Sequence, residues 1–381
     1  MEYETRYASS GDVNIAYQAR GEGALDIVFV PGFISHVEHL WEEPGLARFF
    51  NRLASFARLI VYDRRGTGLS DRLGHAATTE EEVADLTAVL DAVGSERAAL
   101  MAYTVGGQLA SIFAFTHPER TSALLMYATI ARATFAPDYS WAHSPEERDQ
   151  RMGEMAANWG QGSMLEVIAP SAGDDTRLRS WLGRMERLSV SPGSLRQLTD
   201  AIGKADVREL LAEIRVPTLV VHRVDDQMID VGHSRYTADA IPGAKLVELP
   251  GRDNYPGIDP DQIADEVEEF LTGGRRVAEP ERALLSVLFT DIVDSTTRAA
   301  ELGDQRWRDL LSSHDTIVRK ELKRFDGTEV KTIGDGFLAV FDGAPTRAVR
   351  CATAIASAAR DIGVDVRAGL HTGECELMGD D

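Results

Sequence analysis

The chain has 381 residues, enough for two domains that each bury a hydrophobic core. Its formal net charge of −21 argues against nucleic acid and anionic membranes as partners, because both require a basic protein surface. No apolar run approaches the roughly eighteen residues of a membrane helix, the N-terminus is unlike a signal peptide, and only two cysteines occur, so a cytoplasmic protein with free thiols is expected.

The first part of the chain alternates short apolar runs with helix-like patterns, which predicts an α/β fold with a parallel sheet covered on both faces. Buried strands are expected at 26–30, 59–62, 98–103, 123–127, 218–222 and 245–249. Residues from about 134 to 200 break this rhythm with tryptophans and methionines on helix-like segments, which indicates a helical cap inserted over the sheet. We assign residues 1–272 to this domain and 273–282, rich in glycine and charge, to a linker.

Several segments of residues 5–271 resemble the α/β-hydrolase family: VPGF at 30–33, YDRRGTGLSD at 62–71, AYTVGG at 102–107 and HPER at 117–120. In that family a strand ends in a nucleophile elbow, G-x-S-x-G, whose small residues permit a strained turn. Here alanine replaces the first glycine, and Thr104 replaces the nucleophilic serine. Threonine keeps a hydroxyl, but its β-branch crowds the turn.

The same resemblance assigns the acid of the triad to Asp226, with Asp225 as an adjacent alternative, and the base to Asn254. Asparagine cannot take up and return a proton near neutral pH, so the triad of Thr104, Asp226 and Asn254 is degenerate. His222 and His233 are close to Asp226 in the sequence, but neither is expected on the loop that faces the elbow.

The oxyanion hole of the family corresponds to the backbone N–H groups of Phe33 and Val105, which need no particular side chain and can survive the loss of the base. A cap over an unreactive pocket is what a ligand-sensing domain would present, so a regulatory module with a small apolar ligand is the favoured interpretation. A residual esterase-like hydrolase with Thr104 as a weak nucleophile is the alternative. The cap methionines and tryptophans either line this pocket or belong to the core.

After the linker the periodicity changes. Strands are predicted at 284–291, 328–333, 337–342 and 364–370, and helices at 297–325 and 344–360, in the order βαββαβ. The first helix is expected to open at Ser295 or Thr296, both good N-cap residues. We assign residues 283–381 to a second domain.

Two acidic segments stand out in this second domain. In the segment SVLFTDIVDST at 286–296, Asp291 lies at the end of a predicted strand, beside the N-terminus of a predicted helix. The free N–H groups of a helix N-terminus can bind an anion such as a phosphate. EVKTIGDG at 329–336 presents Asp335 in a predicted hairpin turn. Each aspartate alone is common in turns without a function. Together, and followed by RAGLHTGE at 367–374, these segments resemble the class III nucleotidyl cyclases, which implies an α+β, ferredoxin-like fold.

The resemblance implies an adenylate cyclase that converts ATP to 3′,5′-cyclic AMP and pyrophosphate by a two-metal mechanism. It assigns Asp291, Asp335 and the Ile292 carbonyl to two Mg²⁺ or Mn²⁺ ions, which prefer such oxygen ligands. It also implies that the N–H groups of Val293, Asp294, Ser295 and Thr296 bind the phosphates. Because sites of this class form between two subunits, a homodimer is implied.

The resemblance implies that Lys331 and Asp381, with Asp380 adjacent, recognise adenine. A lysine on a strand is, however, often only solvated. In the family the residues that orient the ribose and stabilise the transferring phosphate come after the position of Asp381, so we expect only the N-terminal part of a cyclase domain here. The whole chain resembles actinobacterial hydrolase–cyclase fusion proteins. A catalytically silent ligand-binding protein remains an alternative for the chain as given.

Overall fold

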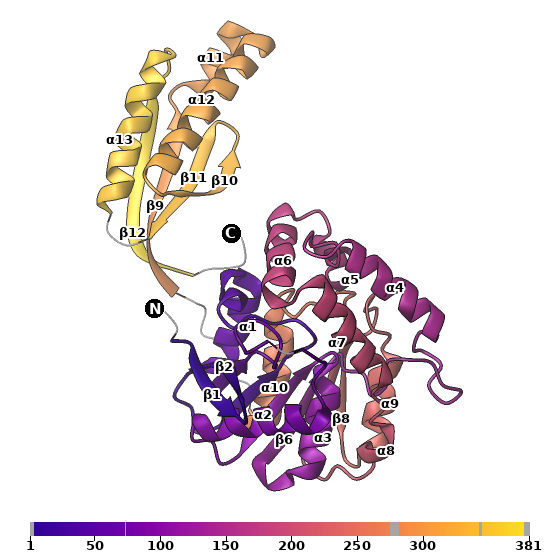
Figure 1. The fold of residues 1–381 in the computed structure, drawn as a ribbon. Coiled ribbons are helices and arrows are strands. Elements are labelled where there is room, and N and C mark those ends of the chain that lie inside the picture. The colour runs from indigo at the N-terminus through magenta and orange to yellow at the C-terminus, as the bar shows by residue number, and fades with distance from the viewer. Residues whose placement is uncertain (1–3, 73, 275–281, 343–344, 377–381) are drawn as a thin grey trace. The chain divides into compact units, whose positions relative to one another are not determined.

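The computed structural model describes residues 4–72, 74–274, 282–342 and 345–376, and it divides into two compact units, Met1–Arg275 and Arg276–Asp381 (Figure 1). The linker predicted at 273–282 lies mostly outside the described residues. Each unit is described by itself below.

The first unit is built on a mixed sheet of eight strands in the order β1-β2-β4-β3-β5-β6-β7-β8. All six predicted strands form and pair in parallel with one another. They are β3 (Asp26–Val30), β4 (Arg58–Tyr62), β5 (Ala98–Tyr103), β6 (Thr121–Tyr127), β7 (Thr218–Arg223) and β8 (Lys245–Leu249).

An antiparallel hairpin, β1 (Arg6–Ser10) and β2 (Val13–Arg20), extends this sheet and was not predicted. β1 is mostly polar with alternating burial, and β2 has an apolar run of only three residues, Ile15–Tyr17, between polar neighbours, which is shorter than the runs of β3, β4, β5 and β6. Gly11 adopts a positive φ of 60° in the turn, a conformation that glycine adopts without strain. The wholly parallel sheet expected from the sequence is therefore corrected to a mixed one.

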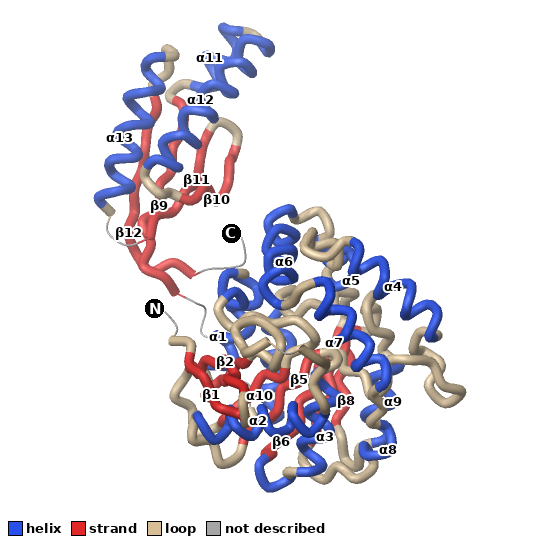
Figure 2. Tube along the Cα trace, in the orientation of Figure 1, coloured by secondary structure: helices blue, strands red, loops and turns tan. Residues whose placement is uncertain are grey.

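Helices cover both faces of the sheet, as Figure 2 shows. Strand residues alternate between two cores: Ile27 and Phe29 pack with the helices α1 and α10, whereas Val28 and Val30 pack with α2 and α3. The helices of the sheet layer are α1 (Pro44–Ala54), α2 (Thr79–Ala92), α3 (Gly106–Thr116), α8 (Arg208–Leu211), α9 (Gly232–Ala240) and α10 (Pro260–Thr272), with short 3₁₀ turns η1 (His39–Glu42) and η2 (Pro118–Arg120).

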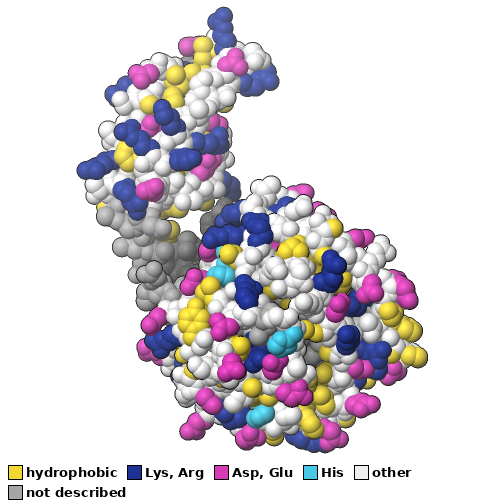
Figure 3. All heavy atoms as spheres, in the orientation of Figure 1, with side chains coloured by type: hydrophobic (Ala, Val, Ile, Leu, Met, Phe, Trp, Pro, Cys, Tyr) yellow, Lys and Arg dark blue, Asp and Glu magenta, His cyan; other side chains and the backbone are white. Residues whose placement is uncertain are grey.

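The predicted cap is present between β6 and β7. It contains α4 (Pro145–Ala157), α5 (Leu165–Ile168), the 3₁₀ turn η3 (Pro170–Ala172), α6 (Thr176–Ser189) and α7 (Pro192–Lys204). Figure 3 shows acidic and basic side chains interspersed over the visible face of the first unit, without a continuous basic patch on that face. No helix within the described ranges has the length and hydropathy needed to cross a membrane.

The second unit has the predicted βαββαβ order and a four-stranded antiparallel sheet, β10-β11-β9-β12. Its elements are β9 (Arg282–Ile292), α11 (Ser295–Leu302), α12 (Asp304–Arg324), β10 (Thr328–Ile333), β11 (Gly336–Asp342), α13 (Thr346–Asp361) and β12 (Val366–Glu376).

The single helix predicted at 297–325 is wrong, because Gly303 adopts φ 73° and separates α11 from α12. The predicted N-cap is also wrong. Asp294, with a left-handed φ of 57°, occupies that position, and Ser295 is the first helical residue.

The two faces of this small sheet differ. Leu288, Phe337 and Phe341 point toward α12 and α13 and form the core with Val318 and Ile355. No helix of the described second unit packs on the opposite face, which presents Phe289, 54% exposed, beside the partly exposed Leu338. We call this surface the open face.

Candidate active sites

The open face brings together the two aspartates predicted as metal ligands. Asp291 lies near the end of β9, and Asp335 lies in the turn between β10 and β11. Because Phe337 pairs with Thr290, the turn reaches the end of β9, and the N–H of Ile292 donates to Oδ2 of Asp335 at 3.2 Å. The two carboxylates therefore belong to one site.

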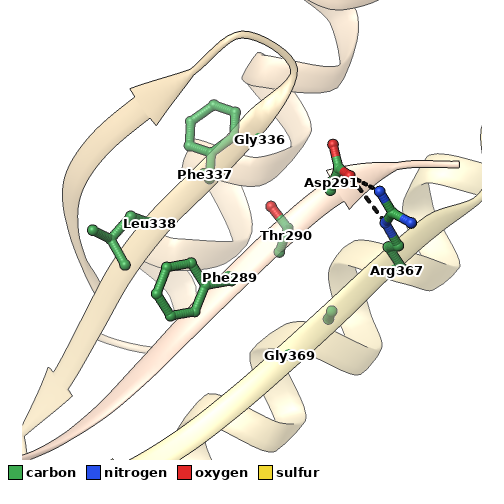
Figure 4. Close-up of a pocket in the computed structure, with 9 residues that line it drawn as sticks. Phe289, Thr290, Asp291, Gly336, Phe337, Leu338, Arg367 and Gly369 are labelled. Carbon is green, nitrogen blue, oxygen red and sulfur yellow. Dashed lines mark hydrogen bonds and ion pairs between the residues drawn. The ribbon is translucent and has the colours of Figure 1, made fainter. Parts of the chain in front are cut away.

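Arg367 on β12 contributes a cation to the same site. It pairs across the strands with Asp291, and its Nε donates to Oδ2 of Asp291 at 2.9 Å, with a second bond from Nη2 (Figure 4). Hydrogen bonding from Arg367 holds the pKa of Asp291 below its ordinary value, so this carboxylate is ionised at neutral pH. An open depression of about 480 Å³, lined also by Phe289 and Leu338, adjoins the pair.

The donor set fits a hard divalent cation. Two carboxylates and nearby backbone carbonyls are oxygen ligands of the kind that Mg²⁺ and Mn²⁺ take. Among the described residues no group of three or more His, Cys, Asp or Glu side chains converges, so Asp291 and Asp335 would need further oxygen ligands from backbone, water or phosphate.

The predicted phosphate cradle is partly engaged within the protein. The N–H of Val293 donates to the carbonyl of Asp365 at 2.9 Å, which leaves it unable to bind a phosphate in this conformation. Asp294 precedes α11, and Ser295 and Thr296 form its first residues, where helix N–H groups lack intrahelical acceptors.

Lys331, proposed to read adenine, is exposed on β10 and pairs with Leu338, so it shares the open face with Phe289 and Asp291. Asp381 and Asp380, its predicted partners, lie outside the described residues. Sequence reasoning did not single out Arg367 as a site residue, although the motif RAGLHTGE begins with it.

In the first unit, the strained elbow of a hydrolase is retained at Thr104. Its φ is 48°, a genuine outlier for a β-branched residue. The turn is possible because Gly106 has no Cβ. A Cβ at this position would lie 2.4 Å from the carbonyl oxygen of Val30. A Cβ at Gly32 would likewise lie 2.6 Å from Oγ1 of Thr104, so the hydroxyl lies directly over this glycine.

Asn254 occupies the position expected for the base and is fully engaged elsewhere. Its Nδ2 donates to Oδ2 of Asp226 at 2.7 Å, and its Oδ1 accepts from the hydroxyl of Tyr103 at 2.6 Å. Among the described residues, no hydrogen bond reaches the hydroxyl of Thr104. The structure thus brings Thr104, Asp226 and Asn254 to one region but connects only the last two. Sequence reasoning did not identify Tyr103 as part of this network.

The two histidines near Asp226 differ in environment. His222 on β7 lies behind the carboxylate, with Nε2 3.4 Å from Oδ2 of Asp226, and bonds Ser234 through Nδ1 at 2.6 Å. His233 on α9 lines a cavity together with Thr104. Burial lowers the pKa of His233 to about 3, so it is a poor general base at neutral pH.

Two cavities meet at Thr104. The inner one, about 80 Å³, is lined by apolar side chains of the core and cap, among them Met164, Trp181 and Met185. The outer one, about 390 Å³, is more polar and includes Arg148, Arg151 and Asp226. Met164, Trp181 and Met185 therefore line the pocket and also pack in the hydrophobic core, so both interpretations of the cap residues apply to them.

Comparison with known proteins agrees with this geometry. Residues 27–266 match the Alpha/beta hydrolase family, and residues 277–379 match the Adenylate and Guanylate cyclase catalytic domain. A pimeloyl-(acyl-carrier protein) methyl ester esterase of Chromobacterium violaceum is 27% identical over 263 residues, which covers 66% of this chain and 94% of the relative.

Solved structures are similar to the first unit. The enol-lactonase of Burkholderia xenovorans is 25% identical with a TM-score of 0.57, covering 70% of this chain and 100% of that structure. An esterase from Exiguobacterium antarcticum, 19% identical, has a TM-score of 0.61 and covers 70% of this chain and 99% of that structure, which supports the fold alone. The chain belongs to the alpha/beta hydrolase family through residues 27–266, and it carries an adenylate and guanylate cyclase catalytic domain at 277–379.

Proposed function

We propose that this protein is an adenylate cyclase-type enzyme that converts ATP to 3′,5′-cyclic AMP and pyrophosphate, with the hydrolase-like domain as a ligand-sensing regulator. The proposal depends chiefly on the meeting of Asp291 and Asp335 at one end of the open face, where the N–H of Ile292 donates to Asp335. Two like charges held close together are costly unless a cation joins them. An ATP-consuming reaction of this kind is expected in the cytoplasm.

In this proposal Asp291 and Asp335, with the carbonyl of Ile292, hold Mg²⁺ or Mn²⁺, two ions per site. When bound, such ions would favour ionisation of the ribose 3′-hydroxyl and neutralise charge on the triphosphate. The N–H groups of Asp294, Ser295 and Thr296 would donate to the phosphate oxygens, since the Val293 N–H already donates to the carbonyl of Asp365.

Lys331 and Asp381 of one subunit of a homodimer would select adenine, while the metal carboxylates would come from the other subunit. The open face supports this arrangement because Phe289, more than half exposed, stands next to Asp291 in a depression that a second copy could cover. Exposed aromatic side chains of this size are typical of surfaces that bind a partner or a ligand.

The regulatory role of the first unit is supported by the chemistry of its elbow. Thr104 keeps a strained backbone and a hydroxyl that faces the cavity. Asn254 cannot act as a base, and both ends of its amide are hydrogen-bonded to other residues. A pocket that binds but does not turn over is suited to sensing a ligand, and the domains 1–272 and 283–381 would then act as sensor and output.

The metal assignment is tested by Mn²⁺ binding and by cyclic AMP formation from ATP in the 381-residue chain. Asp291→Asn and Asp335→Asn are each expected to weaken Mn²⁺ binding, followed by electron paramagnetic resonance, and to abolish any cyclic AMP formation. Asp309→Asn, an exposed carboxylate change on α12, is the matched control. Unchanged Mn²⁺ affinity in both site variants would contradict the proposal.

A second candidate function is residual hydrolysis of esters or lactones by Thr104, because the elbow keeps its strained φ of 48°. Ester and lactone substrates are suggested by the names of the methyl ester esterase and the enol-lactonase described above. Turnover of short acyl nitrophenyl esters that disappears in Thr104→Ala would favour this function. Binding without turnover would favour the sensor.

A further inference from the structure

The pocket of the hydrolase-like unit retains three hydrogen-bond donors with no acceptor. In the described part of the chain, neither the N–H of Phe33 nor that of Val105 donates to any group, and the Thr104 hydroxyl has no partner. Thr104 is only 3% exposed, so its hydroxyl is shielded from bulk solvent and faces the two cavities. Buried polar groups without partners are rare in proteins and call for a ligand or water.

The three donors lie around one place. Thr104 and Val105 are consecutive at the start of α3, and the hydroxyl of Thr104 lies over Gly32, the residue before Phe33. Phe33 and Thr104 border both cavities, so the donors stand at the junction between them. A carbonyl group could bind here with its oxygen at the three donors. The two substituents on its carbon would then lie one in each cavity.

The inner cavity accepts an apolar substituent. Its walls include Leu182 and Met185 of the cap and Leu46 of α1, all nearly or fully buried. At about 80 Å³ it holds several water-sized volumes but offers water few polar partners, so a short acyl chain is the better occupant.

The outer cavity favours an anionic group. Its carboxylates are already hydrogen-bonded: Asp226 accepts from Asn254, and Asp230 accepts from the N–H of Gly232 at 2.7 Å. Arg151 has no carboxylate within ion-pair distance among the described residues, and Glu147 of the same helix interacts with it only at longer range. The guanidinium of Arg148 donates to the carbonyl of Thr199, and its one carboxylate partner in the described part of the chain is Asp149, at 3.5 Å and 79% exposed. Positive charge therefore remains available to a ligand in this cavity.

We propose that the hydrolase-like domain binds, without cleaving it, an acyl amide or ester that has a short acyl chain and an anionic head group. The carbonyl oxygen accepts from Thr104, Phe33 and Val105, the acyl chain fills the inner cavity, and the head group lies near Arg148 and Arg151. The compound stays intact because Asn254 cannot deprotonate the Thr104 hydroxyl. This inference rests on the sensor role proposed above and names the class of its ligand.

Calorimetric titration of the full chain with N-hexanoylglycine tests the site. N-acetylglycine, which lacks the chain, and N-methylhexanamide, which lacks the carboxylate, are each expected to bind at least about tenfold more weakly. Mass spectrometry is expected to recover N-hexanoylglycine intact after prolonged incubation. Equal affinity for the three compounds, or release of glycine, would overturn the proposal.

Variants test the individual contacts. Thr104→Val keeps the shape but removes the hydroxyl, and is expected to weaken binding about tenfold. Thr87→Val on α2, where the hydroxyl bonds its own helix at Val83, is the matched control and should bind as the parent. Arg151→Gln should weaken binding of N-hexanoylglycine several-fold while leaving that of the uncharged N-hexanoylglycinamide unchanged. Full affinity in Thr104→Val would overturn the assignment of the junction.

Met164→Trp provides an independent test, because it fills the inner cavity from a partly buried position. It should weaken binding of N-hexanoylglycine and leave the thermal unfolding temperature close to that of the parent. The sensor role has its own readout, the rate of cyclic AMP formation. If N-hexanoylglycine binds and this rate does not change, regulation is refuted but the binding site is not. No binding of N-hexanoylglycine would refute the site alone.

Discussion

Asn254 donates from Nδ2 to Oδ2 of Asp226 at 2.7 Å, so a neutral amide makes the bond to the acid that a catalytic imidazole would make. The opposite end of the amide accepts from Tyr103 rather than from Thr104. In the proposed site, Asp226 would supply the acid and Phe33 and Val105 the oxyanion-hole donors, whereas Asn254 cannot transfer a proton.

Restoring the base should restore hydrolysis. In the double variant Asn254→His, Thr104→Ser, a histidine held by Asp226 can deprotonate a serine that fits the strained turn better than threonine does. We expect turnover of short acyl nitrophenyl esters about 10²- to 10⁴-fold above the parent chain, the range that general-base catalysis contributes. Initial rates with the nitrophenyl group as reporter measure this.

The gain should depend on the buried acid. Adding Asp226→Asn to the double variant is expected to remove most of the new activity, because the imidazole would lose the carboxylate that orients it. If the triple and double variants were equally active, the restored residues would not be working as a triad.

The central strands could be predicted because they are buried on both faces. Runs such as Ile27–Val30 leave no alternation, and their length distinguishes them from helices. The hairpin β1–β2 was not predicted because β1 is mostly polar and the apolar run of β2 is only three residues long. The break at Gly303 was hidden by the apolar periodicity on either side, although a glycine within a helix pattern is a warning.

The site was predictable only where a motif carried it. The resemblance to the α/β-hydrolases assigned Thr104, Asp226 and Asn254, and each of them follows the carboxyl end of a parallel strand. The bond between Tyr103 and Asn254 joins residues 151 positions apart, and no local pattern indicates it. Arg367 is opposite Asp291 through strand register, which the sequence alone does not define.

Arg367 should compete with metal for Asp291. Its guanidinium occupies Oδ2 of this carboxylate, so Arg367→Gln is expected to tighten Mn²⁺ binding in the absence of nucleotide by up to about fivefold, since an exposed ion pair contributes at most about 1 kcal/mol. Electron paramagnetic resonance of free Mn²⁺ measures the affinity.

Arg319→Gln is the matched control, because Arg319 pairs with Glu329 at 2.9 Å and not with Asp291. Its Mn²⁺ affinity should equal that of the parent. Weaker Mn²⁺ binding in Arg367→Gln would show instead that this arginine organises the site.

The first unit should lose stability in acid because of His233. Burial lowers the pKa of this imidazole from 6.5 to about 3, so below pH 6.5 the unfolded chain binds a proton that the folded chain does not. Stability is therefore complete above pH 6.5 and falls as the pH decreases toward 3, with a total effect of order 5 kcal/mol.

His233→Asn should flatten this dependence, since its amide can still bond Tyr139, which lies 2.8 Å from Nδ1 of His233. Urea unfolding followed by tryptophan fluorescence at pH 7 and pH 4.5 measures it, because four of the five tryptophans lie in the first unit. An identical loss of stability in parent and variant would assign the effect to other groups.

Close approach of α3 to β3 should make Gly106 irreplaceable. A Cβ there would lie 2.4 Å from the carbonyl oxygen of Val30 and 2.6 Å from that of Pro31, and both are backbone atoms that cannot move independently. Gly106→Ala must therefore push the helix from the sheet, at a cost of about 1–3 kcal/mol. Gly153→Ala is the matched control: nothing lies within 4 Å of its Cβ, and it sits inside α4, where alanine favours the helix by about 0.5–1 kcal/mol. Denaturant midpoints that shift in opposite directions would support this account, whereas equal midpoints for the two variants would refute the steric argument.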